Sequence, residues 1–440
     1  MSDRNTPRQA GAAANGLSSD GTPSFGGPAV EADPLAEPTV GVRPLWVSAV
    51  VLVNVGINAA FFGPIQVLLG NQAIAFDEAH KEAILALVTG CGAAVSLVAN
   101  PLFGALSDRT RSRFGRRVPW VVIGAILGSL ALLGLTVAPS VALMAALWCL
   151  VQLGCNGMLA SVTAAIPDRV PVRQRGSIGG FVAMGTVIGI LCGAAMGAVA
   201  GKNFALGYVI CAVALIAGVL LYLFQSQDAP TEGLPREPWS MAGFLRGFWI
   251  NPRRYPDFGW AWLTRFLVQL GVQLCIVYLL FFLRDRVGYT EPEFGVLVLT
   301  GIFSLLTLVT AGIGGWWADR LGRRKIFVMV SSAVIALAAV TLAFFPTWSG
   351  ALLGAGLLGI GQGVYLAVDL ALLTEVLPTA ASRGKDLGVI NVANSLPQVL
   401  SGVMAAFLVT VVGSYVALYL VAGVIGILGA VFVLRIKSVR

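Results

Sequence analysis

Two ionisable side chains, Arg265 and Asp369, lie deep inside long apolar stretches of this 440-residue sequence. At about 1.5 Å per residue, Arg265 lies about 9 Å from the start of its stretch and Asp369 about 12 Å from the end of another. A charge in an apolar medium is costly unless it is paired, so we expect these two groups to form an ion pair. One partner would then exchange its counter-ion for a proton or a bound molecule, with Asp369 as the proton carrier. A static ion pair between two helices is the alternative.

Hydrogen-bonding side chains recur at helical spacing in five of the apolar stretches. They are Asn54 and Asn58; Trp148, Gln152 and Asn156; Gln269 and Gln273; Gln362 and Tyr365; and Asn391, Asn394 and Gln398. Intervals of three, four and seven residues place each set on one face of its helix. We expect them to line a water-filled cavity formed mainly by the first, fourth, seventh and tenth stretches. The alternative is that single amides bond neighbouring helices to each other.

Twelve apolar stretches are long enough to position these groups across a bilayer, since about 20 helical residues span its hydrocarbon core. They cover approximately 45–69, 82–106, 118–138, 141–166, 177–200, 204–224, 259–283, 295–317, 326–346, 350–377, 387–412 and 414–434. In the fifth, glycines recur every four residues from Gly185 to Gly201, which predicts close packing against another helix. The sequence therefore predicts an all-α integral membrane protein with twelve transmembrane helices.

The basic residues indicate the orientation of the chain. With twelve spans, 24 of the 29 Lys and Arg fall on the side that holds both termini, and four on the other. The positive-inside rule then places both termini in the cytoplasm. We expect the protein in the cell (inner) membrane. The net charge of +8 is explained by this topology, so no nucleic-acid partner is expected.

Composition excludes several other classes of protein. Only 11% of residues are charged and 57% are hydrophobic, whereas about a quarter of an ordinary soluble chain is charged. One histidine and six cysteines without a CxxC motif offer no material for a metal site. The sequence contains no nucleophile–base set and no phosphate-binding loop. We expect neither an enzyme nor an ATP-driven pump, no bound cofactor and no obligatory protein partner.

The polar segments predict the domain organisation. Residues 1–40 are rich in Gly, Ala, Pro and Ser, which predicts a disordered cytoplasmic tail. Residues 225–258 are the longest internal polar segment and predict a cytoplasmic central loop. The chain is thus divided into an N-terminal six-helix bundle, 41–224, and a C-terminal six-helix bundle, 259–440.

A charged motif is repeated in the two halves. Residues 104–109 read GALSDR and precede Gly115-Arg116-Arg117, while residues 315–320 read GWWADR and precede Gly322-Arg323-Arg324, an offset of 211. Asp168 in the first half corresponds to Glu375 in the second at an offset of about 208. Two matches at nearly one period indicate duplication of a six-helix unit, with a binding site between the halves.

The repeated G-x-x-x-D-R…G-R-R loop resembles the major facilitator superfamily over residues 45–435. The fuller stretch NPLFGALSDRTRSRFGRRVPW, 100–120, is similar to the glycoside–pentoside–hexuronide cation symporters and sucrose transporters, although Val118 stands where that branch usually has arginine. The resemblance implies two six-helix pseudo-repeats that work by alternating access.

The resemblance also implies a cytoplasmic gate in which Asp108 latches the two halves. The residues expected to form this gate are Asp108, Arg109, Arg116, Arg117, Asp168, Asp319, Arg323, Arg324 and Glu375. A latch must break in each cycle, which suits a charge-assisted contact at a water-accessible edge. The alternative for Asp108 is an ion pair at a helix end with only a local effect.

These observations together predict a secondary transporter for the uptake of a sugar or glycoside. Amides bond hydroxyls and aromatic faces accept a sugar ring, which suits a neutral polyhydroxylated solute. The same side chains would also accept other neutral polar solutes. The resemblance implies that sodium-coupled, melibiose-type relatives pair carboxylates in the second span. We expect no carboxylate in this span before Asp108, so coupling to protons is expected and sodium is less favoured. An exporter of a metabolite or drug and a non-transporting membrane sensor are the alternatives.

Overall fold

The computed structural model describes residues 38–436, apart from 227, 229–230, 232–254, 322–323 and 377–382. Within helices, the side chains at 172, 319, 370–376, 383–391 and 394 are also outside the description. The predicted disordered tail and most of the predicted central loop fall outside the described residues. The boundaries of the two predicted bundles therefore stay a prediction.

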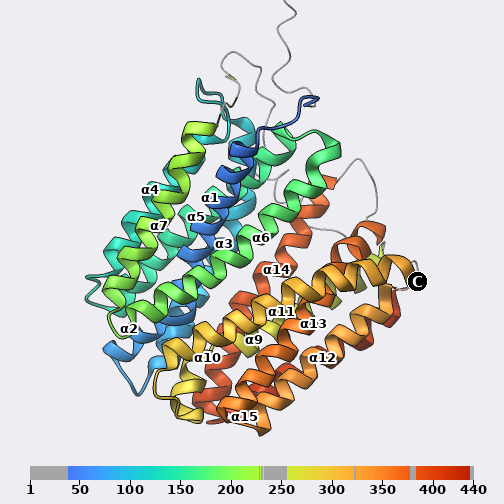
Figure 1. Cartoon of the computed structure of the whole chain (residues 1–440). Helices are drawn as coiled ribbons and strands as arrows, with labels where there is room; N and C mark the ends of the chain where they lie inside the picture. Colours follow the sequence, from blue (N-terminus) through green and yellow to red (C-terminus); the bar gives the residue numbers. More distant parts are fainter. Residues whose placement is uncertain are drawn as a thin grey trace, which may run out of the picture. The chain divides into compact units, whose positions relative to one another are not determined.

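The first half of the described chain is a set of long apolar helices (Figure 1). The helices are α1 Pro44–Gly63, α2 Leu69–Phe76, α3 Lys81–Arg109, α4 Val118–Leu135, α5 Val141–Arg169, α6 Val172–Ala200 and α7 Phe204–Gln225. A π-helical segment, η1 Pro64–Leu68, joins α1 to α2 in one continuous span. Pro64 has no N–H to donate to the preceding turn, which explains why the helix widens there.

The second half repeats this organisation. Its elements are α9 Pro256–Ile276, α10 Leu279–Phe281, η2 Phe282–Val287, α11 Pro292–Leu321, α12 Arg324–Phe344, α13 Trp348–Val376, α14 Arg383–Ala406, η4 Phe407–Val411, α15 Tyr415–Phe432 and η5 Val433–Arg435. These helices coincide with the remaining predicted stretches to within a few residues. Eleven described spans are long and apolar enough to cross a membrane, and a shorter apolar helix, Ser395–Val411, lies in the one remaining predicted stretch, the eleventh. The predicted fold class is confirmed.

Glycines bring α1 and α6 into close contact. A Cβ on Gly185 would lie 3.0 Å from the Val51 carbonyl oxygen, and one on Gly193 would lie 2.6 Å from the Gly63 nitrogen. Larger side chains would force the two helices apart, so the strip is required for packing. Gly201 does not belong to it: its φ of 54° ends α6, and no atom lies near its Cβ position. The expected glycine strip is wrong at that residue.

The two halves pack on each other through two helix pairs. Helix α3 contacts α14, and α6 contacts α11. Within each half, the contacts are extensive, for example between α1 and α7 and between α12 and α15. The candidate site lies between the halves. Its lining includes side chains from α1, α3, α5, α6, α9, α11, α13 and α14.

Candidate functional site

A cavity of about 430 Å³ lies between the two halves. Its polar lining consists of Asn58, Gln66, Thr89, Ser96, Asn100, Trp148, Gln152, Asn156, Thr186, Gln273, Ser395, Gln398 and Ser401. Aliphatic and aromatic side chains such as Phe61 and Ile190 complete it. Among the described residues that line this cavity none is charged.

Helix α5 contributes one continuous polar face to this cavity, as its spacing predicted. Asn156 Nδ2 donates to Gln152 Oε1 at 3.0 Å, and Trp148 lies one turn before them. The Trp148 side chain is fully buried, and its indole Nε1 has no hydrogen-bond partner among the described atoms. It packs against Gly92, where a Cβ would lie only 2.4 Å from Nε1. Gly92 therefore determines where the indole sits.

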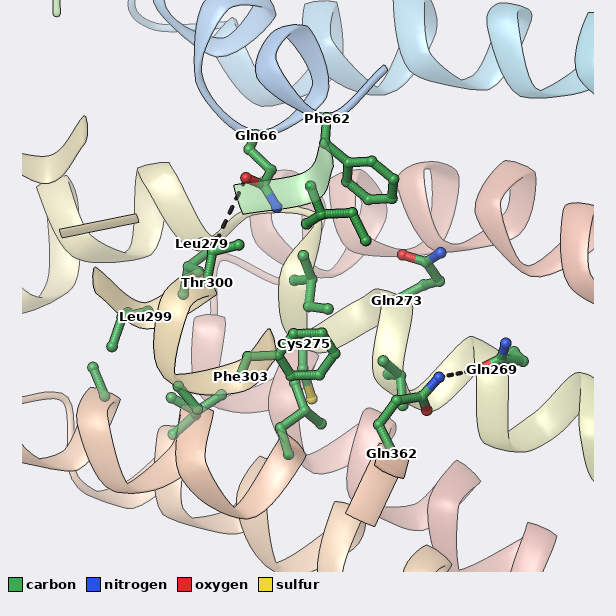
Figure 2. A pocket seen from close by; sticks show the side chains of 17 residues that line it. Phe62, Gln66, Gln269, Gln273, Cys275, Leu279, Leu299, Thr300, Phe303 and Gln362 are labelled. Carbon is green, nitrogen blue, oxygen red and sulfur yellow. Dashed lines mark hydrogen bonds between the residues drawn. The ribbon is translucent and has the colours of Figure 1, made fainter. Parts of the chain in front are cut away.

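A second cavity, of about 170 Å³, adjoins the first and shares Gln66 and Gln273 with it. Figure 2 shows Gln66, Gln269, Gln273 and Gln362 around this space, together with Phe62 and Phe303. Gln362 Nε2 donates to Gln269 Oε1 at 3.2 Å, which joins α13 to α9. The other amide atom, Gln362 Oε1, is buried without a described partner.

Several predicted site residues lie elsewhere. Asn54 is 2% exposed and lines neither cavity; its amide donates to the Val50 carbonyl oxygen. Tyr365 is also buried away from both cavities, because its hydroxyl donates to Asp369. The side chains of Asn391 and Asn394 lie outside the described residues. The predicted lining is therefore wrong at Asn54 and Tyr365.

The structure adds lining residues that the sequence analysis did not name. Helix α3 contributes Thr89, Ser96 and Asn100, so the second span lines the larger cavity as well as the predicted first, fourth and seventh. Ser96 and Asn100 are one helical turn apart, a signal that could have been used. Gln66 could not have been found this way, because its position depends on the π-helical turn after Pro64.

The two membrane charges lie side by side. Arg265 Nη1 on α9 contacts Asp369 Oδ2 on α13, and the two side chains are 12% and 7% exposed. Tyr365 donates to the other carboxylate oxygen, Oδ1, at 2.5 Å. The structure thus brings together the predicted ion pair, and it adds Tyr365 as a third member. The hydrogen bond between Gln269 and Gln362 is a second link between α9 and α13, and Gln269 lies about one helical turn after Arg265.

Ion pairs and hydrogen bonds join the halves at the ends of α3 and η2, on the side away from both termini. This rim cluster consists of Asn71, Glu78, Lys81, Glu82, Tyr278, Arg284, Asp285, Glu293 and Tyr415. Lys81 Nζ lies 2.6 Å from Asp285 and is largely buried, and Asn71 Nδ2 donates to Glu293 at 3.0 Å. Together they close that side of the cavity.

Glu82 corrects the sequence analysis of the second span. It lies in the first turn of α3 and is only 8% exposed, with its backbone oxygen accepting from Tyr278 at 2.6 Å. The span therefore does carry a buried carboxylate before Asp108, at its end rather than in its interior. The expectation that this span has no carboxylate before Asp108 is therefore wrong, and the preference for protons over sodium stays a prediction.

The charged motif after α3 forms a compact network within the first half. Arg117 contacts Asp108 at 2.5 Å and Asp168 at 2.7 Å, and Arg116 contacts Asp168 at 2.5 Å. Burial opposes the charge of Arg117, but the two carboxylates outweigh it and raise the pKa of this guanidinium. Asp108 here fastens the end of α3 to the start of α4, and its role as a latch between the halves stays a prediction.

The start of the central loop docks onto this motif. Thr231 N donates to the Ser112 oxygen at 3.1 Å, and Asp228 lies 3.6 Å from Arg169. Gly115 has a φ of 80°, and a Cβ there would lie 2.2 Å from the Asp228 Cβ. This explains the glycine of the motif, since no other residue fits both the backbone and the space.

The second-half copy of the motif is only partly described. The side chains of Asp319 and Glu375 and the whole of Arg323 are outside the described residues. Arg324 is half-buried at the start of α12, and Arg109 is half-buried at the end of α3. Both arginines have interaction partners. Their predicted gating roles stay predictions.

Comparison with known proteins identifies the family. Residues 45–299 and 261–440 match the sequence profile of the Major Facilitator Superfamily. The chain belongs to the Major Facilitator Superfamily. It is therefore a secondary transporter and a multi-pass membrane protein, as the repeated motif after α3 predicted.

Curated relatives of this superfamily member are distant. The ectoine/proline transporter ProP of Corynebacterium glutamicum is 25% identical over 68% of this chain, and the match spans 65% of ProP. The multi-drug resistance efflux pump PmrA of Streptococcus pneumoniae is 25% identical over 67% of this chain and 73% of its own length. Neither relative supports the expected sugar and sucrose branch.

Solved structures share the fold of this superfamily member. A crystal structure of the peptide transporter POT has a TM-score of 0.74 at 15% identity, covering 91% of this chain and 96% of that chain. A crystal structure of the nucleoside transporter NupG has a TM-score of 0.71 at 12% identity, covering 89% of this chain and 99% of that chain. At such identities the likeness extends to the fold and not to the solute.

Proposed function

We propose that this transporter takes up a neutral polyhydroxylated solute, a sugar or glycoside, together with protons. The observation that carries the proposal is the chemistry of the two adjoining cavities. Their described lining offers amides, hydroxyls and aromatic side chains, among them the indole of Trp148, and no charged group. Such a lining can exchange hydrogen bonds with many hydroxyl groups at once.

The uncharged lining argues against a solute with full charges. An ion that leaves water must find a counter-charge or lose several kcal/mol, roughly, in solvation. Hydroxyl groups need only hydrogen-bond partners, and two buried polar atoms still offer them: Trp148 Nε1 as a donor and Gln362 Oε1 as an acceptor. These atoms support a solute that carries both donors and acceptors.

The proton step is assigned to Asp369. Helices α9 and α13 are joined by two contacts, a hydrogen bond between Gln269 and Gln362 and an ion pair between Arg265 and Asp369. Gln269 and Gln362 line the smaller cavity, so a solute that breaks their hydrogen bond also disturbs the adjacent ion pair. Release of Asp369 from Arg265 would let the carboxylate take up a proton in exchange for its counter-ion. Binding and protonation would thus be coupled through the geometry of α9 and α13.

Uptake by the purified protein in liposomes tests this proposal. Labelled mono- and disaccharides are compared with proline and ectoine at imposed pH and sodium gradients. We expect accumulation of at least one sugar with a pH gradient and none with a sodium gradient alone. Accumulation of proline or ectoine but of no sugar would overturn the solute class.

Export is the alternative that a specific relative supports. PmrA is an efflux pump by name and matches about as much of this chain as ProP does. Imposed gradients distinguish the two: a proton symporter accumulates solute in vesicles with an inward proton gradient, whereas a proton antiporter accumulates it in vesicles with an outward one. Solute-dependent proton release from inverted vesicles during drug accumulation would favour the exporter.

A further inference from the structure

A groove opens between the starting ends of α1 and α6, apart from the cavities between the halves. It has a volume of about 630 Å³ and is open to the outside of the protein. Its lining is apolar over most of its length and polar at one end. The residues are Val42, Pro44, Val47, Ser48, Val51, Leu52, Gln174, Ser177, Ile178 and Phe181.

The groove exists because α1 and α6 diverge. Further along, glycines hold the helices together in a regular register, with Gly185 against Val51 and Gly189 against Val55. Continuing that register would pair Phe181 with Val47, but both side chains instead line the groove. Gly180, the next residue on α6, has no atom near its Cβ position. The apolar part of the groove is therefore left open at the membrane face of the protein.

Two cationic side chains flank the polar end of the groove. Arg43 precedes Pro44 at the start of α1, and Arg173 precedes Gln174 in the first turn of α6. Both side chains are exposed, and within the described part of the chain neither guanidinium has a hydrogen bond or an ion pair. The lining contains no acidic residue. The groove is thus apolar over most of its length, with unneutralised positive charge at its polar end.

We propose that this groove binds one anionic phospholipid of the leaflet on the side of the chain termini. One acyl chain lies between Val51 and Phe181, and the headgroup phosphate lies at Arg43 and Arg173. Guanidinium groups bind phosphate through paired hydrogen bonds, and the hydroxyls of Ser48 and Ser177 stand between the two regions, at the level of the ester groups. Charge complementarity selects an anionic lipid over a zwitterionic one, because the site has no carboxylate to pair with a choline group.

Native mass spectrometry of the detergent-purified full chain tests the headgroup selectivity. It is titrated with phosphatidylglycerol and with phosphatidylcholine of the same acyl chains. Each basic residue near an anionic headgroup contributes about fivefold in affinity, so we expect Arg43→Gln/Arg173→Gln to weaken phosphatidylglycerol binding about 25-fold and to leave phosphatidylcholine unchanged. The control is Lys202→Gln, an exposed cation after the other end of α6, which should change neither. Equal losses in the control and the double variant would overturn the proposal.

Photo-crosslinking identifies the occupant directly. A benzoyl-phenylalanine in place of Ser177 is activated in the full chain, reconstituted in vesicles of phosphatidylglycerol and phosphatidylcholine. We expect capture of phosphatidylglycerol beyond its share of the vesicle lipid. Capture of the chain's own residues 1–37, of a second copy of the chain, or of the two lipids in their vesicle proportions would overturn the proposal.

Discussion

Lys81 on α3 and Asp285 on η2 form an ion pair 2.6 Å long between two segments that lie 204 residues apart in the sequence. The lysine side chain is 8% exposed and the aspartate side chain 29%, so removing Asp285 leaves the buried Lys81 charge without compensation. Such a loss costs about 3–5 kcal/mol. Because the pair joins the halves on the side away from the termini, it stabilises the state in which that side is closed.

Asp285→Leu, which leaves the Lys81 ammonium buried without its partner, is therefore expected to open this side of the transporter. Spin labels at positions 79 and 291, on the loops at the rim, report the separation of the halves by electron paramagnetic resonance in a chain without native cysteines. A cost of about 3–5 kcal/mol shifts the equilibrium by more than about 100-fold, so the longer distance should dominate.

The matched control is Arg284→Met, which breaks a more exposed pair with Glu78 in the same rim cluster. Exposed pairs contribute about 0–1 kcal/mol, so this variant should keep the shorter distance. Lys81→Met/Asp285→Leu removes both charges and should restore it in part. The assignment fails if Asp285→Leu and Arg284→Met give the same distribution of distances.

Asp369→Asn tests the proton step. The variant keeps the shape of the side chain but cannot exchange a proton, so accumulation driven by a pH gradient should be lost while solute counterflow continues. Tyr365→Phe is the control, since it removes only the 2.5 Å hydrogen bond to Asp369 and should retain gradient-driven accumulation at a reduced rate. Unchanged accumulation by Asp369→Asn would leave the pair with Arg265 as a static link between helices.

Gly92→Ala tests the position of the Trp148 indole. The new Cβ would lie 2.4 Å from Trp148 Cδ1 and Nε1, so the ring must move into the larger cavity. Overpacking of this kind costs about 1–3 kcal/mol, and we expect solute affinity to fall by roughly tenfold or more. Equilibrium binding of the transported solute measures it.

Gly90→Ala is the matched control for Gly92→Ala on the same helix. The nearest atom to its Cβ position is 4.0 Å away, on Val403, so affinity should be unchanged. Loss of affinity in both variants would point to a general effect of alanine on α3 rather than to the indole.

Asp108→Asn tests the predicted gate. Asp108 is 58% exposed and its pair with Arg117 contributes little to stability, about 0–1 kcal/mol. The folded chain should therefore keep its solute affinity, whereas turnover should fall if the carboxylate must re-pair in each transport cycle. Wild-type turnover in reconstituted vesicles would reduce Asp108 to a local helix-end contact.

The sequence predicts those features that depend on local spacing. Apolar length reveals the twelve helices, and intervals of four place Trp148, Gln152 and Asn156 on one face of α5. The pairing of Arg265 with Asp369 follows because an isolated charge in a bilayer is so unfavourable that few arrangements remain.

Features that depend on contacts between distant segments could not be predicted. Spacing alone puts Asn54 and Asn58 on the same face of α1, and both amides donate to the carbonyl one turn before them, but only Asn58 lines the cavity. The rim cluster joins segments about 200 residues apart, and no local pattern marks Lys81 as the partner of Asp285. Gln66 depends on a widened helical turn.

Asp228 makes the docking of the central loop onto the charged motif depend on pH. Burial raises the pKa of this carboxyl above its ordinary value of 3.8, although Arg169 opposes the shift. The docked loop therefore binds the proton more tightly than the undocked loop, so docking is strongest at low pH and weakens as the pH rises above 3.8. Hydrogen exchange at the Thr231 amide, which donates to Ser112, measures docking once intrinsic rates are corrected. From about pH 3.5 to about pH 7 its protection should fall in the wild type and stay level in Asp228→Asn. Protection that rises with pH would contradict the sign of the shift.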